Sequence, residues 1–254
     1  MRAAGDVAVI VPAKDEADRV GTTVSAACAL PGVGVVVVVD DGSDDATGVL
    51  ARGAGADVVR HDRCRGKGAA MTSGAEAVRA LDRNDGRDSP RHLLFLDADL
   101  GESARRAAAL VDPVRRGEAD MTIARFPATR PRGGGHGAVV RLSREGIRRA
   151  TGWEASEPLS GQRCLTRRAF DAARPLAGGF GVETALTIDL LRLGFRVREV
   201  EVDLVHRVTG SDLRAQLHRG RQLVDAARAL AVRELPPFTL RWLRGPAERR
   251  DAAT

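Results

Sequence analysis

The sequence is poor in aromatic residues. It has no tyrosine, six phenylalanines and two tryptophans, so aromatic side chains make up 3% of its 254 residues. Proteins that stack nucleic-acid bases need aromatic platforms interleaved with basic side chains. The net charge of +6 comes from 40 Lys and Arg scattered among 34 Asp and Glu. We therefore expect no nucleic-acid partner and take the charge only as support for an anionic ligand.

Cysteines and long apolar runs are also scarce. The three cysteines, Cys28, Cys64 and Cys164, are widely spaced, which indicates neither a disulfide framework nor a zinc site. The longest apolar runs have the length of a strand, and the first residues lack the apolar region of a signal peptide. These absences predict a cytoplasmic protein without stable membrane insertion.

Strand-like and helix-like patterns alternate over roughly the first half of the chain. Such alternation predicts a parallel α/β sheet with helices on both faces and right-handed crossovers. The expected strands are 7–11, 33–39, 57–60, 93–96 and 120–125. The expected helices run to about residue 30 and over 47–55, 69–81 and 104–116, with a surface loop at 82–91.

The regular alternation of strand and helix patterns ends after residue 125. A Gly/Pro/Arg-rich segment at 127–137 is expected to be a functional loop or a linker. The second half then predicts helices at 141–151, 183–193 and 213–232, a turn at 157–163 before a short strand, a strand at 196–205, and a poorly ordered tail at 234–254.

Polar loops follow the predicted parallel strands, so we expect them to meet at one edge of the sheet. The loops are 12–16, 40–45, 63–68 and 97–99. Asp40 and Asp41 suit the donor groups of a base and ribose, and Lys67 suits a phosphate or a base carbonyl. Asp97 and Asp99 suit a divalent cation that carries a diphosphate. Neither GxGxxG nor Walker A follows the first strand, which argues against an NAD enzyme.

Several of these motifs resemble those of a GT-A glycosyltransferase of the family 2 type. They are VIVPAKDE ending at residue 16, VVVVVDDGSDDAT at 35–47, GKGAA at 66–70 and LFLDADL at 94–100. In the second half, PLSGQR at 158–163 and the segment 180–207 resemble the glucosyl-3-phosphoglycerate synthase group. The resemblance implies a single GT-A (Rossmann-like) domain at 1–233, with a nucleotide-binding half to about 125 and an acceptor half from about 126.

The resemblance also implies a role for each matching residue. The nucleoside would be bordered by Pro12, Ala13, Lys14 and Glu16, and its base contacted by Asp41 and Lys67 with Asp40 beside them. Asp97 would face ribose or metal, and Asp99 would ligate Mg²⁺ or Mn²⁺, with His206 completing the metal site. The donor sugar and acceptor would lie beside Gly161, Gln162, Arg163 and Glu183.

Together these features predict transfer of a hexose from a nucleotide-diphosphate sugar, most simply a UDP-sugar, to a small anionic acceptor. The arginines of 125–141, of the 141–149 helix and at 163 suit a phosphorylated or carboxylated acceptor. Glu183 can be the general base of an inverting enzyme or an orienting group of a retaining one. The alternatives are a polyprenyl-phosphate hexosyltransferase at the membrane face, a nucleotidyltransferase and a basic nucleic-acid-binding protein. A homodimer is left open.

Overall fold

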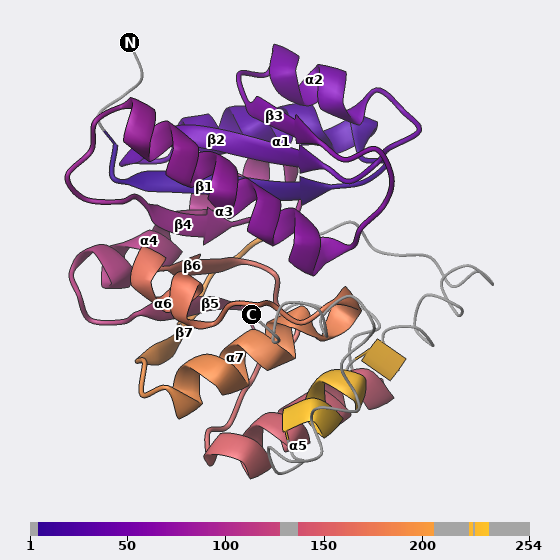
Figure 1. Cartoon of the computed structure of the whole chain (residues 1–254), viewed down its shortest axis with the longest axis vertical. Helices are drawn as coiled ribbons and strands as arrows, with labels where there is room; N and C mark the ends of the chain where they lie inside the picture. The colour runs from indigo at the N-terminus through magenta and orange to yellow at the C-terminus, as the bar shows by residue number, and fades with distance from the viewer. Residues whose placement is uncertain (1–4, 128–136, 206–223, 226, 234–254) are drawn as a thin grey trace, which may run out of the picture.

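One seven-stranded sheet runs through both halves of the part of the chain that the structure describes (Figure 1). The computed structural model describes residues 5–127, 137–205, 224–225 and 227–233. The strand order is β3-β2-β1-β4-β6-β5-β7. The strands are β1 Val7–Ala13, β2 Val33–Asp40, β3 Asp57–Arg60, β4 His92–Phe95, β5 Met121–Arg125, β6 Arg163–Leu165 and β7 Val197–Glu201.

The sheet is mostly parallel, as the alternating pattern predicts. β1 pairs in parallel with β2 and β4, β2 with β3, and β5 with β7. β6 lies between β4 and β5 and is antiparallel to both of them. The beginning of β6 is therefore at the edge of the sheet where β4 and β5 end.

Helices cover both faces of the sheet, which makes a three-layered α/β domain (Figure 1). One face is covered by α1 Ala17–Cys28, α2 Thr47–Gly53, the 3₁₀ helix η1 Gly101–Ala107 and α4 Ala108–Arg115. The other face is covered by α3 Lys67–Asn84, α6 Arg167–Ala172 and α7 Val182–Arg192. A short 3₁₀ turn, η2 Gly179–Gly181, precedes α7, and α5 Ala138–Thr151 packs against α7.

The alternating side chains of β1 explain the two apolar layers. Val9 and Val11 pack with the α1 side of the sheet, whereas Ile10 packs with α3 on the other side. Where α3 crosses β1 there is room only for a glycine, because a Cβ on Gly74 would lie 2.5 Å from Ile10 Cγ2. A central strand buried on both faces reads as a continuous apolar run, which is why β1 and β2 were predictable.

Several predicted boundaries were wrong. The expected surface loop at 82–91 is partly helical, because α3 continues to Asn84, and the buried Asp82 and Arg91 form an ion pair. The expected helix at 104–116 begins as the 3₁₀ helix η1, and the last strand is shorter than the predicted 196–205. The described residues from 224 to 232 are helical, as predicted, whereas 128–136, 206–223 and the tail 234–254 lie outside the described residues.

No helix of the described residues is both long enough and apolar enough to cross a membrane.

Candidate active site

The centre of the site is Lys67, the first residue of α3. Its Nζ lies 2.8 Å from Asp97 Oδ1 and 2.9 Å from Glu183 Oε1. Gln162 closes the group, because its Nε2 donates to Asp97 Oδ2 at 2.6 Å. Asp97 follows β4, Gln162 precedes β6, and Glu183 is the second residue of α7. Four of the residues named from the sequence, from four separate segments, thus meet in one cluster.

Lys67 remains charged in this cluster. Burial alone would lower the pKa of its ammonium, but Asp97 and Glu183 raise it, and the net pKa is above its ordinary value. The Lys67 side chain is 25% exposed, Asp97 31% and Glu183 8%. The cluster is therefore a charged group that faces solvent on the Lys67–Asp97 side and is closed on the Glu183 side.

The backbone of Gly161 lies close to the charged ends of Lys67 and Asp97 in this cluster. A Cβ on Gly161 would lie 2.4 Å from Lys67 Nζ and 2.8 Å from Asp97 Oδ1. Only a residue without a side chain lets the backbone pass so close to the charged groups. The backbone at Gly161 therefore lies against the Lys67–Asp97 pair.

Arg163 does not have the expected geometry for a contact with sugar or acceptor. It is 1% exposed, and its Nε and Nη2 donate to the carbonyl oxygens of Ser160, at 2.7 Å, and Pro158, at 3.2 Å. Its Nη1 donates to Glu183 O at 2.9 Å and to Thr187 Oγ1 at 2.9 Å. Burial lowers the pKa of Arg163 to about 10. Arg163 thus joins the turn before β6 to the start of α7 from inside the protein.

Other arginines expected to attract an anionic acceptor are also engaged by the protein. Arg125 pairs with Glu201 at 3.1 Å. Arg144 donates to the carbonyl oxygens of Ala155 at 2.9 Å and Ser156 at 2.8 Å. The Arg125 pair joins β5 to β7, and the Arg144 contacts fix the segment before β6, so both guanidinium groups are less available to a ligand.

The acidic residues after β2 use their carboxylates within the protein. Asp40 is fully buried and accepts from Ser43 N at 2.9 Å and from the guanidinium of Arg60. Asp41 accepts from the backbone N–H groups of Arg65 and Gly66, each at 2.8 Å. The carboxylate of Asp40 is therefore engaged inside the protein, and Asp41 holds the loop that leads into Lys67.

His61 follows β3 at the same edge of the sheet, and it was not among the site residues predicted from the sequence. Its Nδ1 lies 2.6 Å from Asp41 Oδ1, and its Nε2 lies 2.9 Å from Ser73 Oγ on α3. The pairing of β2 with β3 aligns Asp40 with Arg60, so the next residues, Asp41 and His61, are also neighbours. That strand register was the one signal that could have found His61.

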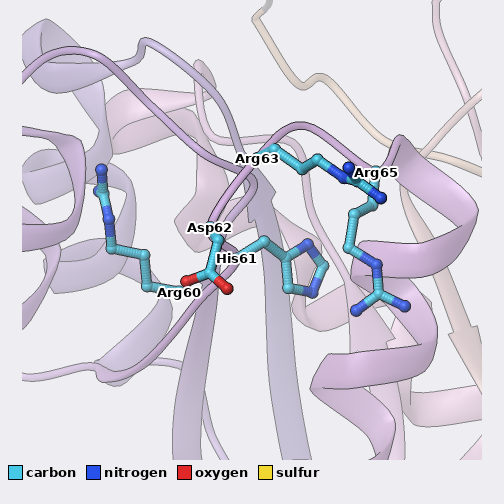
Figure 2. Close-up of a pocket in the computed structure, with 5 residues that line it drawn as sticks. All are labelled: Arg60, His61, Asp62, Arg63 and Arg65. Carbon is cyan, nitrogen blue, oxygen red and sulfur yellow. The ribbon is translucent and has the colours of Figure 1, made fainter.

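An open hollow of about 400 Å³ lies along the segment after β3. Figure 2 shows the residues that line it, Arg60, His61, Asp62, Arg63 and Arg65. Arg60 reaches back to Asp40, and the backbone of Arg65 donates to Asp41, so the rim of the hollow is joined to the end of β2.

The segment after β1 lies at the same edge. Asp41 N donates to Ala13 O at 2.8 Å, and Lys14 Nζ donates to Gly42 O at 2.9 Å. Glu16 N donates to Thr47 Oγ1 at 2.8 Å, at the start of α2. Pro12, Ala13, Lys14 and Glu16 thus border the end of β2, where the predicted nucleoside would lie.

Asp97 and Asp99 are the two carboxylates that the sequence predicts as ligands of a divalent cation. Both carboxylates follow β4 and are half-buried, and Asp99 O also accepts from Arg19 Nη1 at 3.1 Å. The described residues contain no group of three or more metal-ligating side chains, and His206 lies outside them. Mg²⁺ is commonly held by one or two carboxylates together with substrate phosphates, so this donor set fits such an ion.

The glycosyl transferase family 2 model matches residues 8–172, well over half of the chain. The chain belongs to glycosyl transferase family 2. The match begins in β1 and ends at α6, so it includes Lys67, Asp97, Asp99 and Gln162, and α7 with Glu183 lies beyond it.

The relatives include archaeal and bacterial proteins. Glycosyltransferase AglJ of Haloferax volcanii is 32% identical over 213 residues, which cover 81% of this chain and 65% of AglJ. Glucosyl-3-phosphoglycerate synthase of Mycolicibacterium paratuberculosis is 29% identical over 248 residues, which cover 88% of this chain and 69% of the synthase. The chain thus spans about two thirds of the length of these two relatives.

The fold matches that of a solved synthase. The glucosyl-3-phosphoglycerate synthase of Mycobacterium tuberculosis, in a crystal structure with Mn²⁺, UDP and phosphoglyceric acid, superposes with a TM-score of 0.70 and 25% identity. The superposition covers 91% of this chain and 78% of that one. A crystal structure of the same synthase with Mg²⁺ and UDP gives a TM-score of 0.69.

Proposed function

We propose that the protein transfers a hexose from a nucleotide-diphosphate sugar, a UDP-sugar, to a small anionic acceptor in a metal-dependent reaction. The observation that carries this proposal is the cluster in which Lys67 Nζ contacts Asp97 and Glu183 while Gln162 donates to Asp97. The crystal structures of the related synthase with UDP, Mn²⁺ or Mg²⁺ and phosphoglyceric acid support the donor and acceptor classes.

In this proposal, Asp99 and Asp97 hold the cation at the end of β4. A bound Mg²⁺ or Mn²⁺ neutralises the negative charge that develops on the diphosphate leaving group. Lys67 supplies a second positive charge beside Asp97, because its pKa is raised and it stays protonated at neutral pH. The nucleoside then lies along the segments after β1 and β2, next to Lys14 and Gly42.

Gly161, Gln162 and Glu183 are the proposed neighbours of the sugar. Gln162 is 1% exposed and fixed by Asp97, so it orients the carboxylate rather than moving with the ligand. The Glu183 carboxylate is held by Lys67 at the inner end of the cluster, where it can accept a hydrogen bond from a sugar or acceptor hydroxyl. As a base it would give inversion, and as an orienting group it is compatible with retention.

The first test is thermal stabilisation by nucleotides. UDP, GDP, dTDP, CDP and ADP are each added with and without Mn²⁺ to the wild type, Asp99→Ala and the control Asp112→Ala, which removes an exposed carboxylate on α4. We expect a Mn²⁺-dependent shift with UDP in the wild type and the control, lost in Asp99→Ala. No metal-dependent shift with any nucleotide would overturn the proposal.

The second test measures transfer itself. A set of UDP-hexoses is incubated with the protein and with phosphorylated, carboxylated and neutral acceptors, and any product is examined by NMR. We expect a product with anionic acceptors, and the one-bond coupling constant between its anomeric carbon and proton separates inversion from retention. Transfer to neutral acceptors alone would refute the anionic-acceptor part of the proposal.

A further inference from the structure

A C-terminal helix segment, residues 224–225 and 227–233, docks beside α5 and α7 (Figure 1). Leu230 is 4% exposed and packs with Ile147 of α5 and Ile188 of α7. A Cβ on Gly146 of α5 would lie 2.2 Å from Leu230 Cδ2, so Leu230 occupies the space that this glycine leaves. The segment is therefore seated on two helices at once.

Polar contacts fasten the same segment to α7. Arg233 Nε donates to Asp189 Oδ1 at 2.7 Å, and its Nη2 donates to Asp189 Oδ2. Arg192 Nη1 donates to Arg233 O at 2.8 Å. The Arg233 side chain is 13% exposed and Asp189 is 25% exposed. A bidentate, largely buried arginine–carboxylate pair has a defined geometry, so it fixes the position of the segment along α7.

The segment also closes over the glycine-rich turn that begins α7. A Cβ on Gly181 would lie 2.6 Å from Ala229 Cβ and 2.7 Å from Asp225 O. Gly179, with a φ of 65°, lies close to the Asp225 side chain. Glycines leave a chain with much conformational freedom, so a turn of this composition needs outside contacts to hold one conformation.

We propose that the C-terminal helix segment positions Glu183 by holding this turn, and that Arg233 is a positioning residue for it. Glu183 comes two residues after Gly181, and Arg163 donates to its carbonyl oxygen from the other side. The turn is thus held between Arg163 inside the protein and Ala229 outside it. This proposal rests on the proposed function in one respect, the sugar or acceptor hydroxyl that Glu183 would contact.

The contact between Glu183 and Lys67 depends on the position of the first turn of α7. Glu183 Oε1 contacts Lys67 Nζ at 2.9 Å, and a shift of the first turn of α7 by about 1 Å would break that contact and misplace the carboxylate. Lys67, Asp97 and Gln162 come from other elements and are held together by their own contacts, Lys67 with Asp97 and Gln162 with Asp97. Loosening the segment should therefore disturb Glu183 and leave donor binding in place.

The experiment compares Arg233→Met with Arg148→Met in the full chain. Arg148 lies on α5 and pairs with Glu145 within the same helix, so its loss is a matched control for removal of an arginine–carboxylate pair. Hydrogen–deuterium exchange is measured on the peptides that span 179–186 and 227–233. We expect exchange in 179–186 to rise about fivefold or more in Arg233→Met and to stay unchanged in Arg148→Met.

Two further measurements separate positioning from general destabilisation. The Kd of UDP with Mn²⁺ should change less than about twofold in Arg233→Met, whereas kcat for hydrolysis of the UDP-hexose should fall about tenfold at an unchanged KM. The charge-reversed double variant Arg233→Asp with Asp189→Arg restores an ion pair at the same place, and it should recover most of the protection of 179–186.

Faster exchange in 227–233 with wild-type exchange in 179–186 would overturn the proposal, because the segment would then have loosened without releasing the turn. Failure of the double variant to recover protection while it folds normally would also count against it. If the wild type binds no nucleotide, the donor assignment fails, but the exchange measurements still decide whether the segment holds the turn.

Discussion

Lys67 Nζ lies 2.9 Å from Glu183 Oε1, so the first residue of α3 and the second residue of α7 share one ion pair across the site. A carboxylate and an ammonium brought together from two distant helices make the site sensitive to the placement of both. Asp97, on the other side of Lys67, adds a second carboxylate that needs the same cation.

Replacement of the Lys67 ammonium group by an uncharged side chain should destabilise the protein. Lys67→Met leaves two neighbouring carboxylates without their positive partner, and we expect the free energy of unfolding to fall by about 1–3 kcal/mol in urea denaturation. The matched control is Arg105→Met, which removes the exposed pair with Glu102 and should change the free energy of unfolding by less than about 0.5 kcal/mol. Equal stability of Lys67→Met and the wild type would contradict the arrangement.

A methyl group on Gly161 should damage binding more than folding. In Gly161→Ala the new Cβ displaces the ends of Lys67 and Asp97, which are flexible side-chain atoms. We expect the Kd of UDP with Mn²⁺ to rise about tenfold, or about 1.4 kcal/mol, with little change in the thermal midpoint. Isothermal titration calorimetry measures the former and calorimetric melting the latter.

Gly53→Ala is the control for this variant. Gly53 ends α2 and has no atom within 4 Å of a Cβ, so alanine fits there and should leave both quantities nearly unchanged. Tight UDP binding by Gly161→Ala would show that the donor does not use the Lys67–Asp97 cluster.

Acid stability should depend on Asp41. Burial would raise the pKa of this carboxyl, but hydrogen bonds from His61, Arg65, Gly66 and Cys64 outweigh it and hold the pKa below its ordinary 3.8. Because the folded-state pKa is lower than the unfolded one, the stabilisation is fully present above the unfolded pKa. It is lost as the pH falls through the folded pKa.

We therefore expect urea denaturation curves between pH 6 and pH 2.5 to show a decline in the free energy of unfolding below about pH 4. Asp41→Asn should be less stable at pH 6 and show a shallower decline. The exposed Asp112→Asn serves as the comparison and should follow the wild type. Parallel declines for Asp41→Asn and the wild type would mean that Asp41 does not carry this effect.

Arg163 should matter for stability rather than for the acceptor. A lysine cannot serve the four acceptors that the buried guanidinium contacts, so Arg163→Lys should lower the free energy of unfolding by about 2–4 kcal/mol. Arg125→Lys, at an exposed pair with Glu201, is the control. If Arg163→Lys were as stable as the wild type and had a raised KM for the acceptor, Arg163 would contact the acceptor, as the sequence predicts.

The sheet was predictable where the chain leaves strong local signals. The β-branched run of β2 and the apolar run of β4 end in carboxylates, and parallel strands bring such ends to one edge. That reasoning placed Lys67 and Asp97 at one edge, and the structure brings them within 2.8 Å of each other. The three-residue β6 carries no such signal, because its direction is decided by its neighbours β4 and β5.

The uses of individual polar side chains were harder to predict. Asp41 and Arg163 are of residue types that suit ligands, yet most of their hydrogen bonds are to backbone groups of segments that only folding brings close. His61 and Ser73 come from β3's end and from α3, and no local pattern connects them to Asp41. Sequence patterns report which chemistry is available, whereas the satisfaction of buried donors and acceptors depends on the whole fold.

The antiparallel pairing of β5 with β6 has a consequence for divergence within the family. The chain between them, residues 126–162, leaves the sheet and returns to the neighbouring position, as a very long hairpin does. Lengthening or shortening it shifts neither strand, and each doubling of such a loop costs only about 0.6 kcal/mol in closure entropy. Insertions and deletions can thus change this part of the surface, while the register that brings Gln162 to Asp97 stays the same.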